Sequence, residues 1–420
     1  MSAENLNRAC NCRTLDPDAL RRQLEIDPQL TGMYAQILRD RPSMFSSTAV
    51  FISPQQYRSI ADTIAAIERV VQLPSYRQRV LAEAPAIART AGGARGVFMG
   101  YDFHLGLQGP QLIEINTNAG GPLLNLILAR AQHACCRAMD AAMHPVARAR
   151  LPEPDYVAMM REEWHLQHPE RPLGRIAIVD DDPAGQYLLP EFQLFERLFQ
   201  AAGIAAVVAD PSELSLRSGV LYHASGPVDM VYNRLTDFYL DEPRHAELRE
   251  AYRSGAVVLT PHPQAHALYA NKHNLVMLSD AAVLASLGAD AATCSQILAG
   301  VPHTQVVSRA NAEELWAQRR QLFFKPAWGY GSKAAYRGDK LTKRVWDEIL
   351  DADYVAQALV PPSERTVEIE GGDTGLKFDV RAYVYAGNVQ LLAARLYAGQ
   401  TTNFRTQGGG FAPVFVVPEG

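Results

Sequence analysis

The chain has 420 residues, of which 48% are hydrophobic and 20% are charged, and its formal net charge is −5. At about 100–200 residues per domain, this length predicts two or three structural units. The slightly acidic balance disfavours a dedicated nucleic-acid-binding protein, which carries a basic excess. No apolar run is long enough for a membrane span, and the first residues lack a basic segment followed by an apolar one. We expect a soluble cytoplasmic protein without nucleic-acid or membrane partners.

The cysteine spacing fits neither a disulfide framework nor a zinc site. Cys10 and Cys12 would supply half of a metal site, but no second pair follows at a suitable distance. We therefore expect reduced structural thiols at Cys10, Cys12, Cys135, Cys136 and Cys294.

Residues 1–95 are expected to form a helical region. Apolar residues recur at three- and four-residue spacing through Ile60–Val71, and Ser53 followed by proline is typical of a helix start. The pattern changes at residue 96. Two short β-type runs, Gly96–His104 and Pro110–Asn116, flank a turn that contains glycine and proline.

The stretch from 122 to 168 is expected to be helical. After it, the distribution of apolar residues changes. Continuous apolar runs alternate with a helix at Glu191–Ala202, and this predicts a parallel sheet of βαβ units. We expect a Rossmann-like domain over 174–262. No Gly-x-Gly-x-x-Gly follows its first strand, so a dinucleotide site is not expected. The expected strands are Ile176–Val179, Ile204–Ala209, Val228–Asn233 and Ala256–Thr260.

The last third of the chain mixes helices and strands. Short turns such as Ala386-Gly-Asn388 separate the final strands and predict antiparallel pairing. Helices are expected at Asn274–Leu287, Ala312–Arg320 and Lys343–Leu350, and strands at Leu322–Lys325, Tyr354–Val360, Leu376–Tyr385, Val389–Tyr397 and Ala412–Val417.

The strongest local motif lies in the second β-type run. Glu114 and Asn116 are two residues apart, so on a strand they share one face. Asp102 lies on the preceding run and joins them if the two runs form a hairpin. Two carboxylates and an amide oxygen suit Mg²⁺. The alternative is a polar surface hairpin, but the apolar residues between these positions favour burial, where an unpaired carboxylate is costly.

A second motif follows the strand that carries Lys325. Its glycine-bearing loop contains Gly329, Gly331 and Ser332, whose backbone N–H groups could approach phosphate oxygens, and Lys333 adds a cation. The spacing is not that of a Walker A motif. The alternative is an ordinary mobile loop.

Two further groups of residues could contact a nucleotide. The apolar segment Tyr354–Pro362 could hold a flat base with Gln357 at its edge, or it could be a core strand. Asp379 and Arg381 share one strand face, and Arg395 lies on the next strand. The arginines could stabilise a transferring phosphoryl group or an oxyanion, or Asp379 and Arg381 could form a surface ion pair.

Asp102 followed by Glu114-x-Asn116 resembles the magnesium motif of the ATP-grasp ligases, in which these residues bridge two Mg²⁺ ions to the nucleotide phosphates. In ordinary members of this family the motif lies at the end of the domain, downstream of the lysines. Here it precedes Lys272 and Lys325, which is similar to the circularly permuted order of glutathionylspermidine synthetase and its relatives.

The resemblance implies an α/β fold in which residues 96–173 and 263–420 form a circularly permuted ATP-grasp unit. The domain at 174–262 would be the preceding α/β domain of this family. Two departures are present, because no amidase domain precedes the synthetase part and Gly100 stands where glutathionylspermidine synthetase has an arginine. Glutathione and spermidine are therefore not indicated as substrates.

The function implied by the resemblance is an ADP-forming carboxylate–amine ligase that uses ATP and Mg²⁺ and passes through an acylphosphate. Its expected partners are a small-molecule carboxylate and amine, and monomer and homodimer both stay open. The alternatives are a small-molecule kinase and a non-catalytic nucleotide-binding protein. The implied residues are Lys272, Lys325, Lys333, Gly329, Gly331, Ser332 and Gln357 for ATP, Arg395, Arg381 and Lys333 for catalysis, Asp102, Glu114 and Asn116 for Mg²⁺, and Asn233, Arg234 and His262 for the acceptor.

Overall fold

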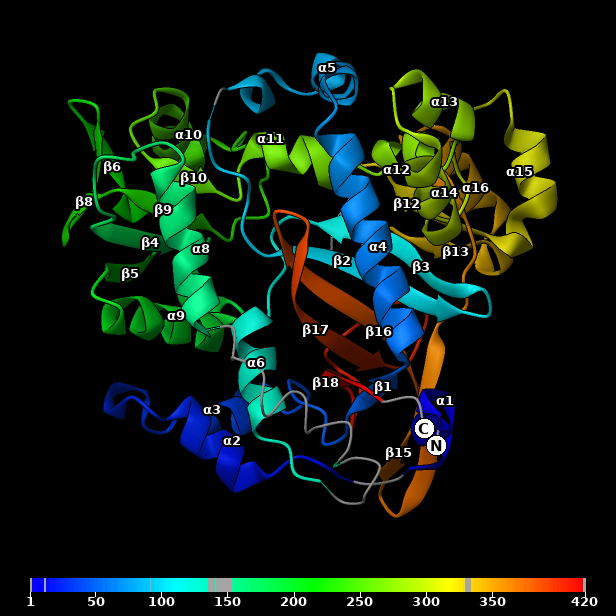
Figure 1. Cartoon of the computed structure of the whole chain (residues 1–420), viewed down its shortest axis with the longest axis horizontal. Helices are drawn as coiled ribbons and strands as arrows, with labels where there is room; N and C mark the ends of the chain where they lie inside the picture. The colour runs from blue at the N-terminus through cyan, green and yellow to red at the C-terminus, as the bar shows by residue number, and fades with distance from the viewer. Residues whose placement is uncertain are drawn as a thin grey trace.

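The computed structural model describes residues 2–10, 13–90, 92–134, 140, 153–328 and 334–417. Within these residues the strands form four sheets, which are surrounded by helices (Figure 1). The expected α/β class is therefore confirmed. No helix in this part of the chain combines the length and apolar character that crossing a bilayer requires.

A seven-stranded sheet lies at the centre of the molecule. Its order is β1-β18-β17-β16-β2-β3, and β15 pairs with β16. Its pairs are antiparallel except for β1 with β18, so the antiparallel pairing predicted for the C-terminal strands is confirmed. The strands are β1 (Val50–Ile52), β2 (Met99–Gly106), β3 (Gly109–Asn116), β15 (Ser363–Ile369), β16 (Gly372–Tyr385), β17 (Asn388–Tyr397) and β18 (Gly410–Val416).

Strand β1 corrects the prediction that the first 95 residues are helical. It has three residues, too few for a recognisable β pattern, and it is held by pairing with β18 at the other end of the chain. The predicted helix start at Ser53 is confirmed by a reciprocal capping box with Gln56. The N-terminal helices are α1 (Ala3–Ala9), α2 (Pro17–Leu24), α3 (Met33–Asp40), α4 (Pro54–Val71), which crosses a face of the central sheet, and α5 (Pro74–Glu83) (Figure 1).

The helix expected over 122–168 is interrupted. Helix α6 (Pro122–Arg130) ends where His133 N–H donates to the carbonyl of Thr14, because the chain turns to pair with an N-terminal segment. Helix α8 runs over Glu153–His165. The positions 135–139 and 141–152 of this expected helix, with Cys135 and Cys136, lie outside the described residues.

The predicted parallel sheet is confirmed in the middle of the chain. Its order is β10-β9-β4-β5, and the three pairs are parallel. Its elements are β4 (Arg175–Val179), α9 (Leu189–Ala201), β5 (Ala205–Ala209), β9 (Met230–Asn233), α10 (Ala246–Arg253) and β10 (Val258–Thr260), with a small antiparallel sheet of β6 (Ser215–Arg217), β7 (Val220–His223) and β8 (Gly226–Val228) before β9.

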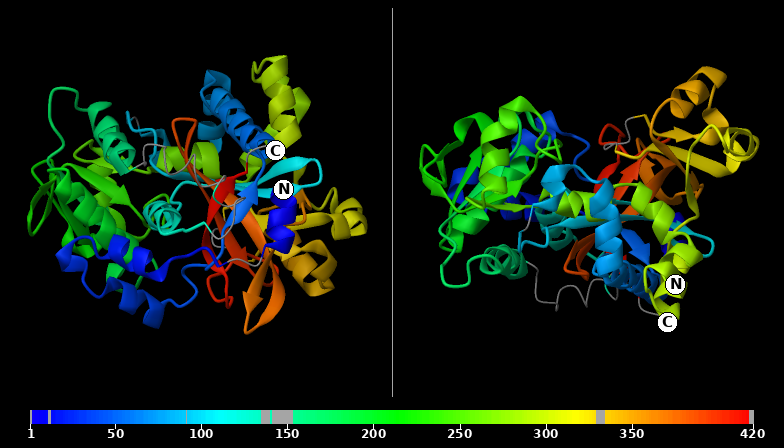
Figure 2. Two further views of the ribbon diagram at one scale, coloured as in Figure 1. Left: turned by 60° about the horizontal axis from the view of Figure 1, so that its bottom comes forward. Right: turned by 90° about the horizontal axis from the view of Figure 1, so that it is seen from above.

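A third, antiparallel sheet lies on the opposite side of the central sheet from the parallel one (Figure 2). Its order is β11-β14-β12-β13, and it has its own apolar core with two helices. The helix expected at Asn274–Leu287 is divided, because the Asp280 carboxylate caps a new helix there. The elements are α11 (Pro263–Ala265), α12 (His273–Leu278), α13 (Ala281–Ser286), α14 (Ala291–Gly300), β11 (Thr304–Val306), α15 (Ala312–Gln318), β12 (Leu322–Pro326), β13 (Tyr336–Arg337), α16 (Lys343–Leu350) and β14 (Tyr354–Ala358).

Candidate active site

Charged side chains of both signs lie next to one another across the central sheet. Strands β2 and β3 form the predicted hairpin, in which Asp102 is the cross-strand partner of Glu114. On its other side Asp102 is the partner of Arg381 on β16. Two residues along β16, Asp379 is the partner of Arg395 on β17. The sheet register therefore brings together three acids and two arginines from four strands.

These groups form a buried ion-pair network. Arg381 makes a bidentate contact with Asp102, at 2.6 Å from Nε to Oδ1 and 2.6 Å from Nη2 to Oδ2. Arg395 donates to Asp102 Oδ2 at 2.8 Å and to Asp379 Oδ1 at 2.8 Å. Although burial lowers the pKa of Arg395, the two carboxylates raise it well above its ordinary value. The alternative of a surface pair between Asp379 and Arg381 is wrong, because each is buried against a different partner.

The predicted juxtaposition of Asp102, Glu114 and Asn116 is present. Asn116 Nδ2 donates to Asp102 Oδ2 at 3.1 Å and to Glu114 Oε1 at 3.2 Å. Burial raises the pKa of Glu114, but the charges of Lys272 and Lys325 and the bond from Asn116 outweigh it, and the pKa is lowered. Glu114 is therefore an ionised carboxylate inside the protein.

Two lysines from later in the chain reach this hairpin. Lys325 on β12 donates from Nζ to the carbonyl of Ile113 at 2.7 Å and to Gln357 Oε1 at 2.8 Å. Burial lowers the pKa of Lys325 to about 8 and also lowers that of Lys272. Gln357 Nε2 is buried without a hydrogen-bond partner among the described residues. Both lysines are therefore desolvated, and an anionic ligand at this place would contact them.

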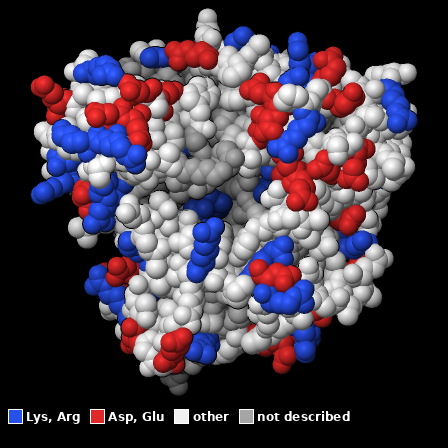
Figure 3. Space-filling view, turned by 180° about the vertical axis from the view of Figure 1, so that it is seen from behind, with Lys and Arg blue, Asp and Glu red and all other residues white. Residues whose placement is uncertain are grey.

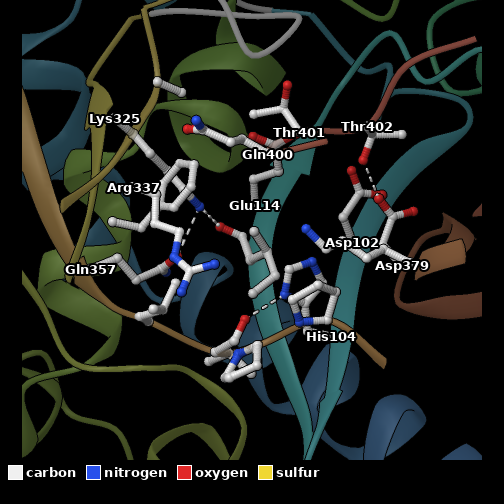
Figure 4. Close-up of a pocket in the computed structure, with 18 of the residues that line it drawn as sticks. Asp102, His104, Glu114, Lys325, Arg337, Gln357, Asp379, Gln400, Thr401 and Thr402 are labelled. Atoms are coloured by element: carbon white, nitrogen blue, oxygen red, sulfur yellow. Dashed lines mark hydrogen bonds between the residues drawn. The ribbon is translucent and has the colours of Figure 1, made fainter. Parts of the chain in front are cut away.

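A first cavity of about 140 Å³ lies between the central and third sheets. Figure 4 shows side chains from the hairpin, including Glu114, on one side of it and Lys325 and Gln357 on the other. Sequence reasoning missed His104, although its spacing of two from Asp102 indicated it. The other charged and amide side chains of the lining that it missed are Arg337, Lys377 and Gln400.

A second cavity of about 450 Å³ lies beside the first, toward the parallel sheet. Four residues line both cavities: Glu114, Lys272, Arg395 and Thr402. On the face opposite to that of Figure 1, the surface is hollowed near its middle, and basic side chains lie in the hollow (Figure 3). The two cavities can therefore hold two ligands that meet at a shared wall.

The structure separates the three predicted acceptor residues. Arg234 lines the second cavity, but Asn233 and His262 line neither of the two. Asn233 Nδ2 donates to the Pro261 carbonyl at 3.1 Å, and the His262 ring contacts the Ala94 carbonyl at 2.8 Å from Nε2. The side chains of Asn233 and His262 therefore bind backbone carbonyl groups. The predicted residues Gly329, Gly331, Ser332 and Lys333 lie outside the described residues.

Several solved structures match this chain at low sequence identity. A glutathione synthetase-like effector from Globodera pallida is 13% identical over 96% of this chain and 98% of that chain, with a TM-score of 0.57. A putative gamma-glutamylcysteine synthetase from Methylobacillus flagellatus is 9% identical over 84% of each chain, with a TM-score of 0.45. The ATP-grasp ligase PsnB, solved with Mg and ADP, is 13% identical over 57% of this chain and 87% of that chain, with a TM-score of 0.29.

The first of these similarities extends over nearly the whole of both chains, and at 13% identity it describes the fold alone. No protein-family model matches the sequence. No curated protein matches it either. The function must therefore be argued from the site itself.

Proposed function

We propose that the protein is an ADP-forming ligase that joins a carboxylate to an amine, with a circularly permuted ATP-grasp unit. The observation that carries this proposal is the wall shared by the two cavities. ATP would occupy the first cavity and the acceptor the second, so that the terminal phosphate meets the acceptor beside Lys272 and Arg395. A site for a single ligand would not need two connected cavities with cations at their junction.

The first cavity has the groups that ATP requires. Lys325 and Lys272 would neutralise phosphate oxygens, and Nε2 of Gln357, which has no partner among the described residues, would bind the edge of the base. Mg²⁺ would take its ligands from Asp102, Glu114 and Asn116. The two carboxylates lie within hydrogen-bonding distance of the Asn116 amide, which directs Nδ2 toward them and would present Oδ1 to the ion after rotation of the amide group. When bound, the ion would draw charge from the phosphates. Among the described residues there is no group of three or more His, Cys, Asp and Glu that could hold a metal, so the Asn116 oxygen is needed.

The reaction would proceed in two transfers. An acceptor carboxylate oxygen attacks the terminal phosphorus, the bond to the ADP oxygen breaks, and an acylphosphate and ADP form. The amine nitrogen then attacks the acyl carbon, phosphate leaves, and the amine loses a proton. Arg395 lies at the shared wall, where it would stabilise the oxyanion of the second transfer.

Thermal unfolding with Mg²⁺ and a non-hydrolysable ATP analogue tests the nucleotide site. Saturation at about 100 times Kd should add roughly 2.7 kcal/mol to the free energy of unfolding. Glu114→Gln should lose the Mg²⁺-dependent part of this shift. Glu313→Gln, at an exposed position on α15, is the matched control. No shift in the wild-type protein would refute the proposal.

ADP release in the presence of pairs of acids and amines tests the reaction. A condensed product, detected by mass, is expected. A phosphorylated product without condensation would instead identify a kinase that uses the same nucleotide site.

A further inference from the structure

The parallel sheet has a crevice that the proposed ATP site does not use. From β4 the chain passes through α9 to β5 on one side, whereas from β9 it passes through α10 to β10 on the other. In open α/β sheets, ligands bind where neighbouring strands lead off in opposite directions, at their carboxyl ends. Asp180 directly follows β4 and Arg234 directly follows β9. Both residues line the second cavity.

Arg234 is buried with unused hydrogen-bonding capacity. Its side chain is 6% exposed and lies over the rings of Tyr232 and Phe192. Its Nε has no partner among the described residues, and Nη1 makes only long contacts, at 3.4 Å to the Tyr232 hydroxyl and 3.5 Å to the Ala119 carbonyl. A guanidinium held this way can still donate hydrogen bonds to a planar carboxylate.

Gly120 keeps the approach to Arg234 open. A Cβ at this position would come 2.9 Å from Arg234 Nη2. The charge of Glu191 also acts on Arg234. The Glu191 carboxylate already accepts hydrogen bonds from the N–H groups of Gly121 and Leu123. Against the effect of burial, the charges of Glu191 and Asp180 raise the pKa of Arg234, but in the described part of the chain no hydrogen bond or ion pair joins either carboxylate to it.

Asp180 is the acidic counterpart. It is 8% exposed, and its carboxylate accepts a bond from Asp181 N–H at 2.9 Å. No ion pair joins it to Arg234 among the described residues, although both line the same cavity. Burial raises the pKa of Asp180 to about 7, with Asp181 and Asp210 acting in the same direction and Arg234 opposing. A ligand cation beside it would restore its charge.

We propose that this crevice binds an α-amino-acid head group, with the ligand carboxylate on Arg234 and the ligand ammonium on Asp180. The inference rests on the proposed function and names its acceptor class. The ligand would extend along the cavity toward Lys272 and Arg395, and these cations select a second carboxylate as the reacting group. The acceptor is thus an amino acid or peptide that carries an α-amino-acid head and a second, distant carboxylate.

Ligand titrations on the protein saturated with the Mg²⁺–ATP analogue test this inference. The probes are the L- and D-forms of aspartate, glutamate and 2-aminoadipate. The amide that each of these amino acids forms with glycine is tested beside it. For a probe that binds, the matched analogues lacking the α-ammonium or the α-carboxylate should bind about tenfold or more weakly. Asp180→Asn and Arg234→Gln should cause losses of the same size. Asp241→Asn and Arg253→Gln, at exposed positions in the same part of the chain, should not.

The pH dependence gives a second readout. Affinity for the probe should increase as the pH rises through about 7, where Asp180 loses its proton, and this dependence should vanish in Asp180→Asn. The inference is overturned if no probe binds while the nucleotide analogue does, or if the analogue without the ammonium binds equally well. Failure of the nucleotide analogue itself would instead refute the proposed function.

Discussion

The guanidinium of Arg381 lies over the backbone of Gly100, so that a Cβ at residue 100 would come 3.1 Å from Arg381 Nε. The same guanidinium makes both bonds to Asp102. An arginine from the neighbouring strand β16 therefore occupies the space beside residue 100, and a larger side chain at this position would collide with it.

Gly100→Ala should therefore destabilise the protein. The new Cβ would come 2.6 Å from the Ala119 Cβ, which cannot move without its backbone, and overpacking of this kind costs about 1–3 kcal/mol. Chemical denaturation measures the loss. Gly92→Ala is the control, because its nearest neighbour would be 3.8 Å away. Equal stability of the two variants would contradict the steric explanation.

Asp102→Asn should destabilise the protein more strongly. It leaves the buried charges of Arg381 and Arg395 without their common partner, and breaking a buried pair on one side costs about 3–5 kcal/mol. Thermal unfolding checks this. Adding Arg381→Met should recover part of the loss, because it removes the stranded charge. Asp18→Asn, which breaks an exposed contact with Arg21, should change the melting temperature little.

The affinity for the ATP analogue should fall as the pH rises through about 8. Lys325 is protonated below its pKa of about 8 and loses its charge above it, so the attraction for phosphate is present at low pH and lost at high pH. Lys272, whose pKa burial also lowers, acts in the same direction. Calorimetric titrations from roughly pH 7 to pH 10 measure the dependence. Lys325→Arg should weaken it, because a guanidinium stays charged, and an unchanged slope would rule out Lys325 as its source.

Arg365→Lys should lower stability without affecting nucleotide affinity. A lysine cannot reproduce the guanidinium fork, and each buried acceptor that loses its partner costs about 1–3 kcal/mol. Denaturation and analogue titration give the two readouts, with the exposed Arg8→Lys as control. A parallel loss of nucleotide affinity would contradict a purely structural role. The fully buried Arg365 donates to the carbonyls of Asn7, Cys10, Ala49 and Thr366 and to the Thr48 hydroxyl.

The sequence by itself determined the strands of the parallel sheet, the start of α4 and the residues of the hairpin. Asp102, Glu114 and Asn116 could be placed on one face because strand periodicity is fixed at two and the turn between the runs is short. The four parallel strands were recognisable as continuous apolar runs, and the start of α4 as a cap followed by proline. These features depend on neighbours within a few residues.

Tertiary structure alone decided which charges pair and where the second ligand could lie. Asp379 has Arg395 as its partner and Arg381 has Asp102, because the register of β16 with β2 and β17 selects them. Strand β1, the partners of Arg365 and the meeting of Asp180 with Arg234 in one cavity likewise depend on residues far apart in the chain. A local sequence pattern does not predict such contacts, because the free energy that stabilises them comes from burial and pairing in the folded sheet.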